Sequence, residues 1–452
     1  MRIKKIRKSL LCLFFAVIPF TLSSCSASST VINGINIWEK YNTLGSYITD
    51  SPSDGLKWIS QRALSLRIRI NPETEGESDK YEFGTAWIYA KDDSSPFTYY
   101  LATNIHVIAN LNKLNSTTER YQESDWGSVK KLENYEFVNL AFNFVTDNQI
   151  SSLIKKPNGE INYLYEYPSP NDNKDTKDYK DTYIALSSGD KAQHPEIVYT
   201  ATGKDLLKNT VDEKNEYINP YSKKIIENPA IDFAIIKVDF SSVLDKTNQN
   251  GTTVKQFLET YDSNPTTFSK SPIIDYNSTF YLAGFPENYE TWKPNLNVAW
   301  LGLNDIKLNS DNNFISLNYE SQISKYANFD NPKGPMPSVS SLSYVKQESK
   351  DNLFLWYRNV ANQLIIGGGS LGGGSSGSML VSEKDNKFYV VGIYWGAYEF
   401  TTRNGIDYAY GGVDLLKTNP YFIDVENRGI TLRYNFPGYD VTKAAGIAVK
   451  EI

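Results

Sequence analysis

The chain has few of the residues from which disulfides or metal sites are built. Its 452 residues include two cysteines, Cys12 and Cys25, and two histidines, His106 and His194. Cys12 lies in an N-terminal segment with the charge layout of an export signal, so the mature chain keeps one cysteine and forms no internal disulfide. A hydrophobic core therefore has to supply the stability, for which 40% hydrophobic and 13% aromatic residues are ample. We expect no metal and no other cofactor.

Long apolar runs are also lacking after Cys25, so no transmembrane helix is expected there. The first residues place five positive charges before an apolar run, Leu10–Leu22, that is too short to span a bilayer comfortably. The run ends in LSSC, which resembles the lipobox of bacterial lipoproteins, where the cysteine is acylated and becomes the mature N-terminus. We therefore expect a lipoprotein signal peptide over 1–24, a lipid such as palmitate on Cys25, and a tether over 25–52. The expected location is the outer face of the cell membrane.

The chain also has no excess of positive charge. Residues 1–24 hold five positive charges and no negative ones, so their removal changes the formal net charge from −6 to −11. An acidic mature chain argues against nucleic acid as the main partner.

Alternation of apolar and polar residues dominates the chain after a short helix that we expect to begin at Ser53 and to carry Leu56, Trp58, Ile59 and Ala63. Such alternation, rich in β-branched and aromatic residues, predicts strands. Two groups of about six strands indicate a mainly β fold, either two barrels or a two-sheet sandwich. The predicted strands cover 64–70, 81–90, 97–103, 135–145 and 232–240, then 278–285, 297–303, 314–319, 378–383, 387–395 and 407–416.

Polar tracts separate these strands and are expected to bury little surface. The clearest is YPSPNDNKDTKDYKDTY at 167–183, which is rich in charge and marked by proline. We interpret the tracts as insertions at about 110–133, 150–225, 243–272 and 320–352.

Glycine and serine supply eleven of the twelve residues from Gly367 to Ser378. A slack linker is one interpretation, but LII precedes the run and a strong strand pattern follows it. A phosphate-binding loop would need a lysine after the glycines, and Gly367–Val381 has no basic residue. The remaining interpretation is the turn of a nucleophilic serine.

The run offers more than one candidate nucleophile. Ser370 fits G-x-S-x-G, the elbow of α/β-hydrolases, but those enzymes need a histidine after the serine and both histidines precede it. Ser376 lies in Gly374–Ser378, which reads G-x-S-G-S, and Ser375 and Ser378 are its neighbours. In that turn the N–H groups of Gly374 and Ser376 would form an oxyanion hole.

A histidine base must then lie upstream. His106 lies in LATNIHVIAN, at the end of a predicted strand and the start of a helical turn, whereas His194 lies in a polar loop. Asp232 opens the alternating segment DFAIIKV, where its carboxylate could hold the imidazole in the tautomer that accepts the serine proton. The predicted catalytic residues are therefore His106, Asp232 and Ser376.

Several segments resemble a trypsin-like serine protease of the chymotrypsin fold, in family order. They are FGTAWIYA (83–90), LATNIHVI (101–108), IDFAIIKV (231–238), FYLAGFP (280–286), GSSGSML (374–380) and VVGIYWGAY (390–398). The resemblance implies a chymotrypsin-like double β-barrel with long insertions and a helical N-terminal extension. The protease domain would cover 53–452, with barrel one at about 64–242 and barrel two at about 273–425.

With its lipobox, its low cysteine content and its Tyr-, Asn- and Lys-rich composition, the chain resembles the mycoplasma surface lipoproteins that include the mycoplasma immunoglobulin proteases. The resemblance implies a lipid-anchored serine endopeptidase acting on host proteins. The substrate that the resemblance implies is the antibody heavy chain, which these proteases cut with the help of a separate antibody-binding lipoprotein. The alternative is a binding protein without catalysis, an adhesin or complex subunit, on a protease-like scaffold.

Overall fold

The computed structural model describes the chain from residue 53 onward, in segments. The longer ones are 53–72, 80–108, 135–147, 183–188, 191–210, 229–248, 250–272, 278–286, 300–308, 361–367, 373–403, 406–427 and 430–452, with short pieces between them. The expected signal peptide, the tether with Cys25, Ser370 and most of the expected insertions other than 243–272 lie outside the described residues. No helix in the described part is long and apolar enough to cross a membrane.

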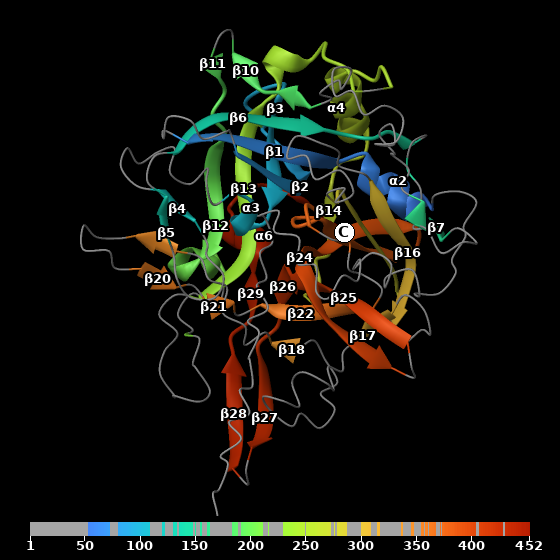
Figure 1. The fold of residues 1–452 in the computed structure, drawn as a ribbon. Coiled ribbons are helices and arrows are strands. Elements are labelled where there is room, and N and C mark those ends of the chain that lie inside the picture. The colour runs from blue at the N-terminus through green and yellow to red at the C-terminus, as the bar shows by residue number, and fades with distance from the viewer. Residues whose placement is uncertain are drawn as a thin grey trace, which may run out of the picture.

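The first sheet fills the upper half of Figure 1. Its strand order is β12-β13-β3-β2-β1-β6-β9, and the pairs along this path are antiparallel. A further short strand, β21, pairs in parallel with β13. The bounds are β1 Ala63–Pro72, β2 Lys80–Lys91, β3 Thr98–Thr103, β6 Tyr135–Asn143, β9 Ile184–Ala185, β12 Glu196–Thr202, β13 Pro229–Asp239 and β21 Arg358–Asn359.

The second sheet lies in the lower half and has the order β18-β22-β17-β16-β15-β23-β24-β14-β30. Strand β25 pairs with both β22 and β24, and so links the two sides of this sheet. The bounds are β14 Thr267–Phe268, β15 Thr279–Gly284, β16 Leu301–Leu308, β17 Phe314–Ser316, β18 Met336–Pro337, β22 Asn362–Gly367, β23 Met379–Lys384, β24 Lys387–Arg403, β25 Ile406–Leu415 and β30 Lys450–Glu451.

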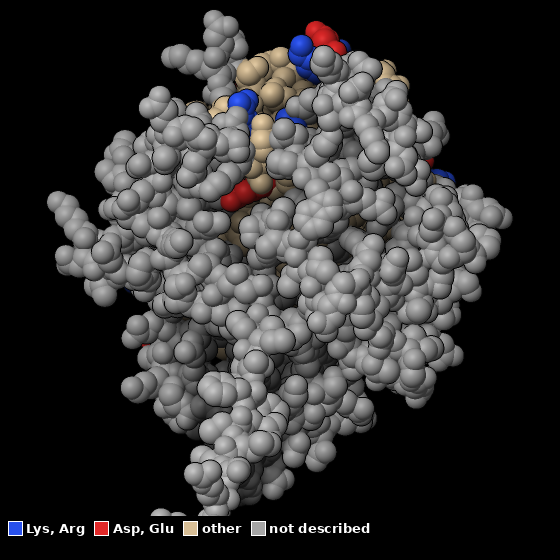
Figure 2. Space-filling view, in the orientation of Figure 1, with Lys and Arg blue, Asp and Glu red and all other residues tan. Residues whose placement is uncertain are grey.

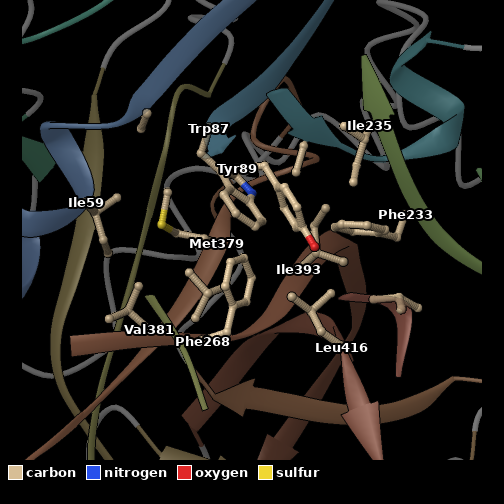
Figure 3. Packing of buried hydrophobic residues seen from close by; sticks show 14 of the residues in the cluster. Ile59, Trp87, Tyr89, Phe233, Ile235, Phe268, Met379, Val381, Ile393 and Leu416 are labelled. Carbon is tan, nitrogen blue, oxygen red and sulfur yellow. The ribbon is translucent and has the colours of Figure 1, made fainter. Parts of the chain in front are cut away.

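The alternation in the sequence becomes two buried faces on the first sheet, because successive side chains of a strand point to opposite sides. In β2, Ala86 and Ile88 face a core within the first sheet, whereas Trp87 and Tyr89 face a second cluster. That second cluster also takes Met379 and other residues of the second sheet (Figure 3). Residues of both sheets therefore share one hydrophobic cluster.

The mainly β class predicted from the sequence is confirmed, and each predicted strand segment overlaps an observed strand. The ladders do not establish a pair of closed barrels. The first sheet ends at β12 on one side and β9 on the other, with no pairing between these ends in the described chain.

Two helices pack on this framework. α2 (Asp54–Ser60) begins after Ser53, whose hydroxyl accepts from the Leu56 N–H at 3.2 Å, so the predicted helix start is confirmed. Ala63, expected in that helix, instead starts β1. α4 (Val254–Ser263) lies in the tract 243–272, where little burial was expected. That expectation is wrong, because α4 buries four side chains: Val254, Phe257, Leu258 and Tyr261.

The remaining elements are short and connect or flank the sheets. They are α3 Ile105–Ile108, β4 Arg120–Gln122, β5 Lys130–Leu132, β7 Ile154–Lys155, β8 Ile161–Asn162, β10 Ser187–Ser188, β11 Lys191–Ala192, η3 Gly203–Leu206, η4 Ser241–Val243, β19 Val345–Gln347, β20 Phe354–Trp356, β26 Lys417–Thr418, β27 Tyr421–Asn427, β28 Ile430–Phe436, β29 Tyr439–Asp440 and α6 Val441–Ala444. On the face drawn in Figure 2, the described charged side chains at the top include both signs close together.

Candidate active site

His106 lies in the single helical turn α3, which follows β3 after one residue. A Cβ built on Gly84 of β2 would come 2.2 Å from Cγ1 of Val107. The glycine therefore makes room for α3 directly on β2, and this contact places His106 at the end of the first sheet.

Asp232 holds the imidazole of His106 from the neighbouring strand β13. Its Oδ2 lies 2.6 Å from Nδ1 of His106, and its Oδ1 accepts from the N–H groups of Ile105 at 2.8 Å and His106 at 3.3 Å. The Asp232 side chain is fully buried. Because an ionised carboxylate only accepts hydrogen bonds, Nδ1 carries the proton, and Nε2 is the nitrogen that can accept one.

The second sheet fixes the backbone of Asp232. Its N–H donates to Oδ2 of Asp414 in β25 at 3.3 Å, and Oδ1 of Asp414 accepts from Nε2 of Gln363 in β22 at 2.7 Å. Asn104, next to α3, donates its Nδ2 to the carbonyl of Asp232 at 2.5 Å. Both sheets thus hold this aspartate, and nothing in the local sequence around Asp414 indicated this role.

Ser376 lies in a tight turn before β23. Gly374 has φ 79° and Gly377 has φ 96°, both in the left-handed region that favours glycine. Gly377 also has no room for a side chain, because a Cβ there would come 1.9 Å from the carbonyl oxygen of Thr85. The N–H of Gly377 donates to the Tyr394 carbonyl at 2.8 Å, which ties the turn to β24.

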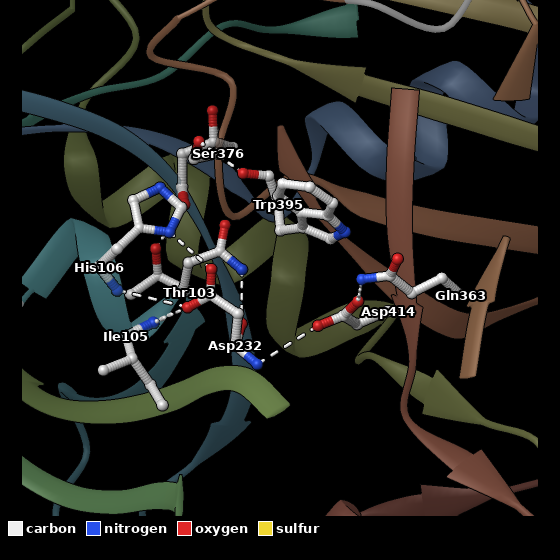
Figure 4. A network of polar contacts seen from close by, with 10 residues as sticks. Thr103, Ile105, His106, Asp232, Gln363, Ser376, Trp395 and Asp414 are labelled. Atoms are coloured by element: carbon white, nitrogen blue, oxygen red, sulfur yellow. Dashed lines mark hydrogen bonds and ion pairs between the residues drawn. The ribbon is translucent and has the colours of Figure 1, made fainter. Parts of the chain in front are cut away.

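Thr85 of β2 connects the serine turn to the histidine segment. Its N–H donates to the Ser376 carbonyl at 2.8 Å, and its Oγ1 donates to the Gly374 carbonyl at 3.1 Å. Its own carbonyl accepts from Oγ1 of Thr103, three residues before His106, at 2.8 Å. Figure 4 shows Ser376 on the side of the imidazole away from Asp232. His106 and Asp232 are thus in direct contact, and hydrogen bonds through Thr85 and Thr103 connect the turn of Ser376 to the histidine segment.

The other candidates differ in their surroundings. The hydroxyl of Ser378 donates to the Ser375 carbonyl at 2.6 Å, and that of Ser375 lies 3.5 Å from the Leu371 carbonyl. The Ser376 hydroxyl donates to the Trp395 carbonyl at 3.3 Å. His194 is exposed in the loop between β11 and β12. Within the described residues, no group of three or more His, Cys, Asp or Glu side chains is arranged to hold a metal ion.

A carboxylate, an imidazole and a hydroxyl in this order can perform nucleophilic acyl transfer, with the imidazole as the proton carrier. The N–H groups of Gly377 and Ser378 already donate to the carbonyls of Tyr394 and Ser375. These two N–H groups are not the ones predicted to bind the oxyanion, which are the N–H groups of Gly374 and Ser376.

The described residues form a mainly β protein, in which Asp232 bonds to Asp414 of the second sheet and Thr85 of the first sheet bonds to the turn that holds Ser376. The family model described as mycoplasma immunoglobulin protease matches residues 53–396, more than half of the chain, and the chain belongs to this family.

The solved structures to which this chain is similar include the following two. One is described as the structure of the mycoplasma MIB and MIP proteins, with 16% identity, a TM-score of 0.40, and coverage of 77% of this chain and 54% of that one. This chain thus spans about half the length of that protein. The other is a thermostable serine protease, AL20, from an extremophilic microorganism, with 10% identity, a TM-score of 0.29, and coverage of 79% and 93%. The comparison with curated proteins returned no match.

Proposed function

We propose that this protein is a serine endopeptidase with Ser376 as nucleophile, His106 as general base and acid, and Asp232 as the group that orients His106. The observation that carries the proposal is the 2.6 Å contact of His106 Nδ1 with a fully buried carboxylate, with Ser376 beyond the imidazole. Membership of a family described as proteases supports it.

In the proposed mechanism, Oγ of Ser376 attacks the carbonyl carbon of the scissile peptide while Nε2 of His106 takes the hydroxyl proton. The N–H groups of Gly374 and Ser376 stabilise the oxyanion that forms. The C–N bond then breaks, and the proton passes from His106 to the leaving amine. Water, deprotonated by His106, next attacks the ester, which releases the acid and returns the proton to Ser376.

The proposal extends to architecture and location. We interpret the two sheets as the two barrels of a chymotrypsin-like fold, with the site between them. The proposed substrate is a host protein, and the family description names immunoglobulin. We propose the antibody heavy chain as the part that is cut, presented by a separate binding lipoprotein. A lipid on Cys25 would hold the enzyme on the outer face of the cell membrane.

A fluorophosphonate probe tests the catalytic part, because it reacts only with an activated serine. We expect the purified protein to be labelled, and Ser376→Ala to abolish labelling and to lower kcat by about 10⁴-fold or more without unfolding the protein. The matched control is Ser375→Ala in the same turn, which should still be labelled. Absence of labelling in the unmodified protein would favour a binding protein on a protease-like scaffold.

A further inference from the structure

Ser378 holds one peptide group of the serine turn with two hydrogen bonds. Its N–H donates to the Ser375 carbonyl at 3.0 Å, and its hydroxyl donates to the same oxygen at 2.6 Å. Ser375 and Ser378 are both fully buried, so bulk water cannot replace the hydroxyl. Both donors therefore fix the direction of the Ser375 carbonyl.

The direction of that carbonyl also decides the direction of the Ser376 N–H. The two groups belong to one trans peptide unit, in which C=O and N–H point in opposite directions within a plane. Thr85 holds the carbonyls on either side, those of Gly374 and Ser376, at 3.1 and 2.8 Å. The amide of the proposed nucleophile is thus oriented before any substrate binds.

Gly284, the last residue of β15, makes the space for the Ser378 hydroxyl. A Cβ built on Gly284 would come 1.8 Å from Oγ of Ser378 and 3.1 Å from its Cβ. Gly284 has no positive φ, so space rather than backbone conformation is the reason for glycine here. Ala283 of β15 pairs with Met379 of β23. Gly284 and Ser378, which come directly after and directly before these two residues, are therefore adjacent.

We propose that Ser378 is a positioning residue that orients the Ser376 N–H as an oxyanion donor, and that Gly284 provides the space this requires. The inference rests on the proposed function, because it assigns a role within the same site. Ser378 does not contact the reacting atoms. It acts through the Ser375 carbonyl, and its effect is confined to the transition state, where the oxyanion carries its charge.

The first test compares Ser378→Ala with Ser375→Ala, whose hydroxyl makes only the 3.5 Å contact. Loss of a whole oxyanion donor costs about 10²- to 10³-fold in kcat, so loosening one should cost about tenfold, with KM changed by less than about twofold. The affinity for a peptide aldehyde, which forms an oxyanion on the serine, should fall by the same factor, while the affinity for a cleaved product peptide should not. Ser375→Ala should leave all four quantities within about twofold.

The second test reaches the same hydroxyl from β15. Gly284→Ala displaces Oγ of Ser378 and should reproduce the kcat and aldehyde defects of Ser378→Ala. In the Ser378→Ala background that oxygen is gone, and the remaining contacts of the new methyl group, with Cβ of residue 378 at 3.1 Å and with Oγ1 of Thr85 at 3.2 Å, require only small shifts. Gly284→Ala should therefore add less than about twofold, a clear departure from additivity. Additive effects, or a Ser378→Ala defect confined to thermal stability, would overturn the inference and leave the proposed function standing. An unmodified protein without activity would overturn both.

Discussion

His106 and His194 are the only histidines, and their surroundings predict opposite effects of mutation. His106 is buried against the Asp232 carboxylate, whereas His194 is exposed in a loop. We expect His106→Ala to lower kcat by about 10⁴-fold or more, because the triad acts as a unit. His194→Ala is the matched control and should change activity by less than about twofold, as surface substitutions usually do. Equal losses in hydrolysis assays of both variants would contradict the assignment of the base.

At this scale the sequence could predict His106, Asp232 and Ser376, because each lies in a short segment with informative flanks. It could not predict Thr85 or Asp414. Thr85 contacts Gly374 across 289 positions, and Asp414 contacts Asp232 across 182. Hydrogen bonds of that separation follow from packing, and no local pattern reports them.

Among the elements, α4 gives the clearest test of the packing. Phe257 is buried and stacks on Phe144, with 4.5 Å between ring centroids. Phe257→Ala should lower the free energy of unfolding by about 3 to 5 kcal/mol, measured by urea denaturation. Glu259→Ala on the exposed face of α4 is the control, and its 3.9 Å surface ion pair with Lys255 is worth about 1 kcal/mol at most. A loss below about 1 kcal/mol for Phe257→Ala would mean that α4 is not part of the core.

The sequence did contain signals for this helix. Its buried residues have the spacing i, i+3, i+4, i+7 from Val254 onward, and Thr253 and Gln256 form a capping box. The tract 243–272 is polar in overall composition, and polar composition does not exclude an amphipathic helix with one buried face. The strands were predicted more completely, because a period of two persists over many residues in each of them.

For the whole molecule, the N-terminal sequence predicts where the protein acts. If Cys25 is acylated, mass spectrometry of the membrane fraction should find it as the mature N-terminus with a diacylglycerol thioether. Cys25→Ser should be poorly processed or shed, while probe reactivity is kept, because no proposed catalytic residue lies in 25–52. A protein that still begins at Met1 and is recovered from the cytosol would remove both the anchor and the argument for a host protein substrate.

The sequence by itself determined the mainly β class, the start of α2 and the three residues proposed for catalysis. Periodicity, helix capping and flanking residues are local properties, so they can be recognised in the sequence without knowledge of the fold. Only the tertiary structure decided that Thr85 holds both sides of the serine turn, that Asp414 supports Asp232 from the second sheet, and that Gly284 makes room for Ser378. These contacts form because two sheets share one core, and that packing brings distant strands to within hydrogen-bond distance.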